Sequence, residues 1–201
     1  MPTIYDLKPS FQRLLRPVCD WLARHGITPN QLTVGTALMS LAEGLWLTLE
    51  PGARLPLLVL PLVLFVRMGL NAIDGMLAKE NRLQSPLGAL LNELGDVVSD
   101  IVLYLPFALI PGVNPVIVVL IVIAGIIAEM SGVVTVQIGA SRRYDGPLGK
   151  SDRAFLFGCI AFIFGVGIMP VVWIDVVLFV GLLLSFYTVY NRARHGLQEN
   201  T

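Results

Sequence analysis

Two aspartates flank a short polar turn in the middle of the chain. Asp74 lies 11 residues before Ser85, and Asp96 lies 11 residues after it. If the chain forms an antiparallel pair of helices that turns near Ser85, both carboxylates lie at a similar depth, about 16 Å from the turn at 1.5 Å per residue. Two carboxylates at one level repel each other strongly unless a cation lies between them. The spacing therefore predicts that Asp74 and Asp96 share a site for a divalent metal ion.

Other side chains on the same two helix faces extend this site. Asn71 lies about one turn before Asp74, and Asn92 about one turn before Asp96. Their amide oxygens would complete a shell of hard oxygen ligands, which suits Mg²⁺, Mn²⁺ or Ca²⁺. The small residues on these faces are Gly75, Ala78 and Gly88. Because small residues leave room for a ligand, the pattern indicates a pocket for a metal-bound phosphate.

A structural alternative for these charges stays open. Arg67 lies on the same helix face as Asp74 and could pair with Asp74 or with Asp100. Ionisable groups inside a spanning helix are costly and usually pair with one another. For the same reason we expect Glu43 and Glu129, which lie in the middle of apolar segments, to pair with Arg67 or with a neighbouring helix.

The composition is typical of a membrane protein. Of the 201 residues, 55% are hydrophobic and only 14% are charged, and the mean hydropathy is +0.76; a soluble domain averages about 25% charged residues. The formal net charge is zero, so no basic field favours a nucleic-acid partner. A spanning helix needs about 20 mostly apolar residues. Six stretches come near that length: 31–50, 55–79, 86–111, 114–139, 154–170 and 172–191.

An amphipathic segment precedes these stretches. Residues 7–24 carry apolar residues at helical spacing with basic residues set among them. This pattern suits a helix that lies in the membrane interface, with its basic residues toward anionic lipid headgroups. We therefore predict an all-α membrane protein with a single domain, 1–201, in which the interfacial helix 7–24 precedes a bundle of six transmembrane helices, 31–191.

The basic residues predict the orientation of this bundle. With six spans, both termini and two loops lie on one side of the membrane, and that side holds twelve of the fourteen Lys and Arg residues. Arg54 lies on the opposite side, and Arg67 lies within a helix. By the positive-inside rule the basic side is cytoplasmic. Both termini and the site near Ser85 are thus expected to face the cytoplasm.

The residues around the two aspartates resemble the motif of the CDP-alcohol phosphatidyltransferase family. That motif is Asp-x-x-Asp-Gly-x-x-Ala-Arg, then eight residues, then Gly-x-x-x-Asp-x-x-x-Asp. The eight-residue spacer, 80–87, has the required length, and residues 25–33 look like the family's entry to its first spanning helix. The resemblance therefore covers nearly the whole chain. The matching positions are Asp74, Gly75, Ala78, Gly88 and Asp96.

The chain departs from the family motif at three positions. Asn71 and Asn92 stand where the motif has its first and third aspartates, and Lys79 stands where it has arginine. This pattern is similar to that of a little-characterised bacterial subgroup. Each Asp-to-Asn change removes one negative charge from the ligand shell. Either the site holds one metal ion in place of the family's usual two, or Asp100 and Glu93 substitute as ligands.

The resemblance implies a role in phospholipid biosynthesis. The implied reaction is the transfer of a phosphatidyl group from CDP-diacylglycerol to a small alcohol with release of CMP, and the implied cofactor is Mg²⁺ or Mn²⁺. Asp96 would be the general base, in a homodimer of the bacterial inner membrane. The implied metal ligands are Asp74, Asp96, Asn71, Asn92 and Asp100, and the implied CDP-binding residues are Asn71, Asp74, Gly75, Ala78, Lys79 and Gly88.

A second group of cations is a candidate for binding the acceptor. Arg143, Lys150 and Arg153 lie in a basic segment beside the predicted site, and arginine is a good bidentate partner for phosphate. In family members that use a phosphorylated acceptor, a basic group near this point holds the phosphate. The same charges also follow from the positive-inside rule, with contacts to lipid headgroups. A phosphorylated and an unphosphorylated acceptor therefore both stay open.

Two other functions are compatible with a polar pair of helices. A small-solute transporter would need a polar route through several helices, but the last two predicted spans hold few ionisable residues in their middles. A catalytically silent scaffold would keep the fold and lose metal ligands. The asparagines at positions 71 and 92 keep this alternative open.

Overall fold

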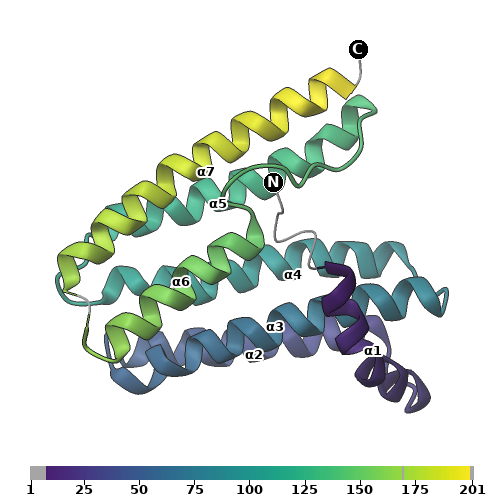
Figure 1. Ribbon diagram of the computed structural model, residues 1–201, viewed down its shortest axis with the longest axis horizontal. Helices are drawn as coiled ribbons and strands as arrows, with labels where there is room; N and C mark the ends of the chain where they lie inside the picture. The colour runs from purple at the N-terminus through teal and green to yellow at the C-terminus, as the bar shows by residue number, and fades with distance from the viewer. Residues whose placement is uncertain (1–7, 169, 200–201) are drawn as a thin grey trace.

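The computed structural model describes residues 8–168 and 170–199, and the regular secondary structure of this part is helical (Figure 1). All six predicted spans coincide with helices, although α6 begins at Lys150 and α7 continues to Glu199. Residues 7 and 169, at or near the ends of predicted segments, lie outside the described residues. The helices are α1 (Lys8–Arg24), α2 (Pro29–Leu49), α3 (Arg54–Glu80), α4 (Pro86–Tyr104), η2 (Leu105–Leu109), α5 (Pro115–Val134), η3 (Thr135–Ile138), α6 (Lys150–Gly165) and α7 (Val171–Glu199).

Four of the described helices are long and apolar enough to cross a membrane by themselves. They are α2, α3, α7 and the continuous segment Pro115–Ile138, formed by α5 and η3. α6 has only 16 residues, and α4 carries Glu93, Asp96 and Asp100 within its 19 residues. The described residues are thus all-α, with four helices apolar enough for a membrane protein. That α4 and α6 also span the membrane stays a prediction.

The helices pack as two groups. α2 packs against α3 and α4, and α3 also packs against α6, while α5 pairs with α7. Figure 1 shows that α5 and α7 diverge from α4 toward the C-terminus. Aromatic rings pack α4 and η2 against α6, where Tyr104 stacks on Phe157 at 4.1 Å between centroids and Phe107 meets Phe157 edge-on at 5.1 Å. This buried apolar core holds the bundle together and leaves the polar residues between the diverging ends.

The turn between α3 and α4 lies where the sequence predicts it. α3 ends at Glu80 and α4 begins at Pro86. Ser85 caps α4, because its hydroxyl accepts a hydrogen bond from the backbone N–H of Gly88 at 3.0 Å. Proline at the first position of a helix supports such a start. The two helices therefore form the predicted hairpin around residues 81–85.

α1 lies against α3. Cys19 is buried in a small apolar cluster with Ile73 and Leu77. On the other side of the helix, Leu14 and Trp21 are exposed. An apolar face directed away from the protein suits a helix in the membrane interface.

Candidate active site

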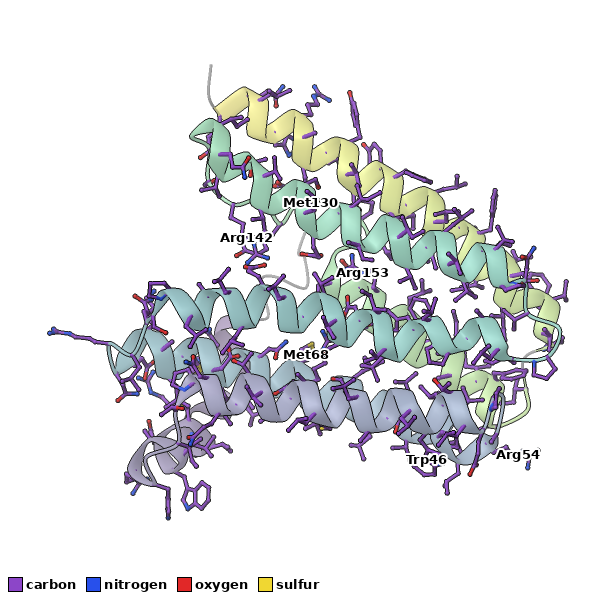
Figure 2. All side chains as sticks on the ribbon, turned by 180° about the vertical axis from the view of Figure 1, so that it is seen from behind. Trp46, Arg54, Met68, Met130, Arg142 and Arg153 are labelled. Carbon is purple, nitrogen blue, oxygen red and sulfur yellow. The ribbon has the colours of Figure 1, made fainter. Side chains whose placement is uncertain are left out.

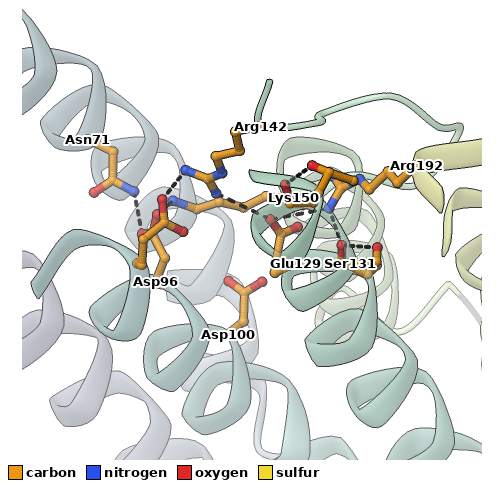
Figure 3. A network of polar contacts seen from close by, with 12 residues as sticks. Asn71, Asp96, Asp100, Glu129, Ser131, Arg142, Lys150 and Arg192 are labelled. Carbon is orange, nitrogen blue, oxygen red and sulfur yellow. Dashed lines mark hydrogen bonds and ion pairs between the residues drawn. The ribbon is translucent and has the colours of Figure 1, made fainter. Parts of the chain in front are cut away.

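α3 and α4 bring the two predicted carboxylates to neighbouring positions. Asn71 Nδ2, on α3, donates a hydrogen bond to Asp96 Oδ1, on α4, at 2.9 Å (Figure 3). Arg67 Nη2 donates to the backbone carbonyl of Asp96 at 2.9 Å and lies 3.6 Å from Oδ1 of the same residue. Asp74 follows Asn71 by about one turn on α3. The hairpin therefore brings the turn of α3 that holds Asn71 and Asp74 against the turn of α4 that holds Asp96.

Asp74 has a partner that sequence spacing does not reveal. Its side chain is only 7% exposed, and Oδ2 accepts a hydrogen bond from the hydroxyl of Thr33, on α2, at 3.0 Å. Thr33 ends the segment 25–33 that resembles the family's first helix, but no spacing rule connects it with Asp74. The contact adds a third helix to the site.

Lys150 joins the same site. As the first residue of α6, it places its ammonium group in contact with Asp96 Oδ2. Both side chains are partly exposed, in contrast to Asp74. The predicted acceptor-binding lysine therefore contacts the predicted general base.

The residues present fit a hard divalent ion. The described residues contain no group of three or more His, Cys, Asp or Glu suited to a metal, so the oxygen donors are the carboxylates of Asp74 and Asp96 with the amides of Asn71 and Asn92. Mg²⁺ and Mn²⁺ are commonly bound by one or two carboxylates while water and substrate phosphates supply the other ligands. Asn71 directs its nitrogen toward Asp96, and a half-turn of the amide would present its oxygen instead.

The two glycines of the motif have different surroundings. A Cβ added at Gly75 would meet no atom within 4 Å, whereas at Gly88 it would lie 2.8 Å from Asn30 Oδ1 and 3.0 Å from Ser85 Oγ. The space at Gly88 is thus filled by the side-chain ends of Asn30, from α2, and Ser85, whereas Gly75 borders open space. Ala78 and Lys79 follow Gly75 on α3, where Lys79 is exposed. The open end of α3 is therefore at Gly75 and Lys79.

Asp100 takes part in a different arrangement from the one expected of a metal ligand. Its Oδ1 accepts a hydrogen bond from Arg67 Nη1 at 2.6 Å, and its Oδ2 accepts one from Arg153 Nη2 at 3.1 Å. All three side chains are largely buried. Arg67 therefore pairs with Asp100, one of the two partners that the structural alternative gives it, and the role of Asp100 as a metal ligand stays a prediction.

This network continues to Glu129, on α5. Glu129 Oε1 lies 2.9 Å from Arg153 Nη2, and Oε2 lies 3.5 Å from Arg192 Nη1 and 3.8 Å from Arg142 Nη2. Arg142 also pairs with Glu93. Figure 2 shows Arg142 and Arg153 between α4 and the α5–α7 pair. The expectation that Glu129 is paired is confirmed, whereas Glu43 Oε1 is buried without a hydrogen-bond partner among the described residues.

The predicted acceptor residues do not share one environment. Arg153 is 3% exposed and lies inside the network. Arg143 pairs at 2.8 Å with Asp145, in its own loop, and with Glu199, at the end of α7. Burial would raise the pKa of Asp145, but the hydrogen bonds and charge of Arg143 outweigh it and hold that pKa below its ordinary value. Arg143 therefore fastens the 139–149 loop to α7, and Lys150 alone of the three contacts Asp96.

Comparison with known proteins gives a family for the chain. The sequence model of the CDP-alcohol phosphatidyltransferase family matches residues 26–189. Inner membrane protein YnbA of Escherichia coli (strain K12) is 44% identical over 195 residues, which cover 97% of this chain and 96% of that protein. The archaetidylinositol phosphate synthase of Aeropyrum pernix is 30% identical over 143 residues, 71% of this chain and 70% of that protein.

Solved structures show the same fold. The phosphatidylinositol phosphate synthase of Mycobacterium tuberculosis with CDP-DAG bound superposes with a TM-score of 0.76 at 19% identity, over 92% of this chain and 94% of that one. The same enzyme in complex with manganese and citrate gives a TM-score of 0.72 at 19% identity, over 91% and 88% of the two chains.

Proposed function

Because this chain belongs to the CDP-alcohol phosphatidyltransferase family, we propose that it transfers a phosphatidyl group from CDP-diacylglycerol to a small alcohol and releases CMP. The observation that carries this proposal is the contact of Asn71, from α3, and Lys150, from α6, with the Asp96 carboxylate beside Asp74. A carboxylate held at an open, polar end of a helix hairpin is suited to take a proton from an alcohol.

The donor would bind along the open end of α3. Asp74, Gly75, Ala78 and Lys79 lie on consecutive turns there, and Gly75 borders open space. Asn71 and Gly88 complete the proposed CDP site. The neighbour of known structure that contains CDP-DAG has the same fold, which supports this donor.

The proposed metal ligands are Asp74 and Asp96, with Asn71 and Asn92 contributing amide oxygens. A bound Mg²⁺ or Mn²⁺ ion would neutralise negative charge on the diphosphate and on the departing CMP. A solved neighbour contains manganese. The donor set of two carboxylates supports a single ion that keeps water and phosphate oxygens among its ligands.

The chemical step uses Asp96 as general base. The acceptor hydroxyl gives its proton to the Asp96 carboxylate while its oxygen forms a bond to the phosphorus of the phosphatidyl group. The bond from that phosphorus to the CMP oxygen breaks, and CMP leaves with the electron pair. Lys150 holds the carboxylate through Oδ2, and Asn71 contacts Oδ1 when its amide nitrogen faces Asp96. General acid–base catalysis of this kind is worth about 10²–10⁴-fold in rate.

The membrane arrangement is part of the proposal. Two observations support a bacterial inner-membrane location: the sequence is similar to that of an inner membrane protein, and four of its described helices are apolar enough to cross a membrane. We propose that α4 and α6 span the membrane together with these four, since α4 and α6 pack along them and their charged residues pair inside the bundle. Both termini and the site would then face the cytoplasm. A homodimer is the proposed assembly.

Release of radiolabelled CMP from CDP-diacylglycerol by the purified protein tests the function. We expect release that depends on an added alcohol and on Mg²⁺ or Mn²⁺. A catalytically silent scaffold or a transporter would release no CMP with any alcohol, and that outcome would reject the proposed reaction.

A further inference from the structure

Three arginines from separate segments converge on one carboxylate of this chain. Glu129 belongs to α5, Arg142 to the loop after η3, Arg153 to α6 and Arg192 to α7. The guanidinium nitrogens lie 2.9 Å (Arg153), 3.5 Å (Arg192) and 3.8 Å (Arg142) from Glu129 oxygens (Figure 3). A group of arginines of this kind could recognise a phosphate, because the planar guanidinium donates paired hydrogen bonds to oxyanions. Here the anion in the middle of the group is the side chain of Glu129.

The two buried arginines, Arg153 and Arg192, also donate to other groups of this chain, whereas Arg142 Nε is buried without a hydrogen-bond partner among the described residues. Arg153 Nη1 donates to the carbonyl of Leu148 at 3.3 Å, and its Nη2 also reaches Asp100. Arg192 Nε donates to the carbonyl of Asp145 at 3.1 Å, and its Nη1 donates to Ala128. Arg153 and Arg192 are only 3% and 2% exposed. A phosphate would therefore have to displace existing contacts in order to bind either guanidinium.

The Glu129 group is connected to the proposed general base. Arg67 contacts both Asp96 and Asp100, and Arg153 contacts both Asp100 and Glu129. A small acceptor whose hydroxyl reaches Asp96 would thus have these ion pairs within reach of its other end. Asp96 and the Glu129 group are parts of one polar region.

The charges of this region balance almost completely. The cations are Arg67, Arg142, Lys150, Arg153 and Arg192, and the carboxylates are Glu93, Asp96, Asp100 and Glu129. An added phosphate dianion would meet carboxylates that already neutralise the arginines. Like charges repel most where burial weakens screening. An uncharged alcohol end would meet no such repulsion and could hydrogen-bond to the rim of the network.

We propose that Glu129 acts as a built-in anion that makes this enzyme select an acceptor alcohol without a phosphate group. The proposal rests on the proposed transfer reaction and adds the class of its acceptor. Glu129 is a specificity-determining residue in this role, since it acts by neutralising Arg142, Arg153 and Arg192.

Matched pairs of acceptors test the proposal in the wild-type protein. Glycerol is compared with glycerol 3-phosphate, and inositol with inositol 1-phosphate, by CMP release from CDP-diacylglycerol. For whichever pair the enzyme accepts as substrate, we expect kcat/KM to be at least tenfold higher for the unphosphorylated member than for the phosphorylated one. A higher kcat/KM for the phosphorylated member would overturn the proposal, but it would leave the transfer reaction established. Absence of CMP release with every alcohol would instead reject the reaction itself and the proposal with it.

The variant Glu129→Gln tests whether this residue is responsible. This substitution keeps the side-chain size and removes the charge. We expect kcat/KM for the phosphorylated acceptor, divided by kcat/KM for the unphosphorylated acceptor, to rise at least tenfold. The rise should come from a lower KM for the phosphorylated acceptor. Glu129→Asp keeps the charge and should keep the wild-type ratio. Glu80→Gln, which removes the carboxylate of the exposed Arg16–Glu80 pair, is the control for charge loss elsewhere.

Two results would contradict this role of Glu129. One is an unchanged ratio in Glu129→Gln, which would make the residue a structural partner of the arginines only. The other is the same rise in Glu80→Gln. If Glu129→Gln does not accumulate in the membrane, the wild-type comparison of the acceptor pairs decides the acceptor class by itself.

Discussion

Asn71 donates its side-chain hydrogen bond to Asp96 across the α3–α4 interface at 2.9 Å. The family motif has an aspartate in place of Asn71, and two carboxylates in such a contact would repel each other without a cation between them. The asparagine therefore gives the hairpin a favourable contact that does not depend on a metal ion.

Restoring the aspartate should make stability depend on metal. In Asn71→Asp the hydrogen bond is lost and a second carboxylate faces Asp96, so we expect a loss of about 1–3 kcal/mol of stability in chelator and recovery in Mn²⁺. Thermal unfolding in detergent, with EDTA or with Mn²⁺, measures this effect. The wild-type protein should respond less to Mn²⁺, and an equal gain in Tm for both proteins would contradict the prediction.

Asp96→Asn should remove catalysis and preserve the fold. The side chain keeps its shape and partial polarity but can no longer accept a proton from the alcohol. We expect acceptor-dependent CMP release to fall by about 100-fold or more, while the protein accumulates in the membrane at the wild-type level. Asp20→Asn, on the exposed side of α1, is the matched control. More than half of the wild-type activity in Asp96→Asn would exclude the residue as the base.

The hairpin was predictable from the sequence because its geometry is local. Ser85 and Pro86 mark the turn, and equal spacing on both sides brings Asp74 and Asp96 together. The contact of Thr33 with Asp74 was not predictable, since it depends on how α2 lies against α3. Likewise, Glu129 was expected to be paired, but its three arginines come from segments joined by loops whose course no periodicity describes.

The buried pairs also changed the interpretation of single residues. Asp100 has the residue type and the helical position of a metal ligand, but Arg67 and Arg153 use both of its oxygens. Sequence spacing identifies which carboxylates share a helix face. It does not show which of them a guanidinium from another helix neutralises.

Asp100→Asn should therefore act mainly on stability. It leaves Arg67 and Arg153 buried without their carboxylate, and breaking a buried pair typically costs about 3–5 kcal/mol. Chemical unfolding in detergent measures the loss. Glu80→Gln, which breaks an exposed pair, should cost at most about 1 kcal/mol. A stable Asp100→Asn protein that needs much more Mn²⁺ for activity would instead support a ligand role for Asp100.

Alanine at the two motif glycines should give opposite results. At Gly75 the added Cβ meets no protein atom within 4 Å, and alanine favours a helix over glycine by about 1 kcal/mol, so Gly75→Ala should be at least as stable as the wild type. The methyl group would enter the space proposed for CDP, and the KM for CDP-diacylglycerol should rise several-fold.

At Gly88 the Cβ would lie 2.8 Å from Asn30 Oδ1 and 3.0 Å from Ser85 Oγ, so Gly88→Ala should displace the Asn30 side chain and the Ser85 cap of α4 and cost about 0.5–2 kcal/mol. Thermal unfolding of both variants in detergent measures the change in stability. The KM for CDP-diacylglycerol, measured for each variant that folds, measures the change in donor binding. Since Gly75, unlike Gly88, borders open space, a destabilised Gly75→Ala with an unchanged KM would place the CDP site elsewhere than along the open end of α3.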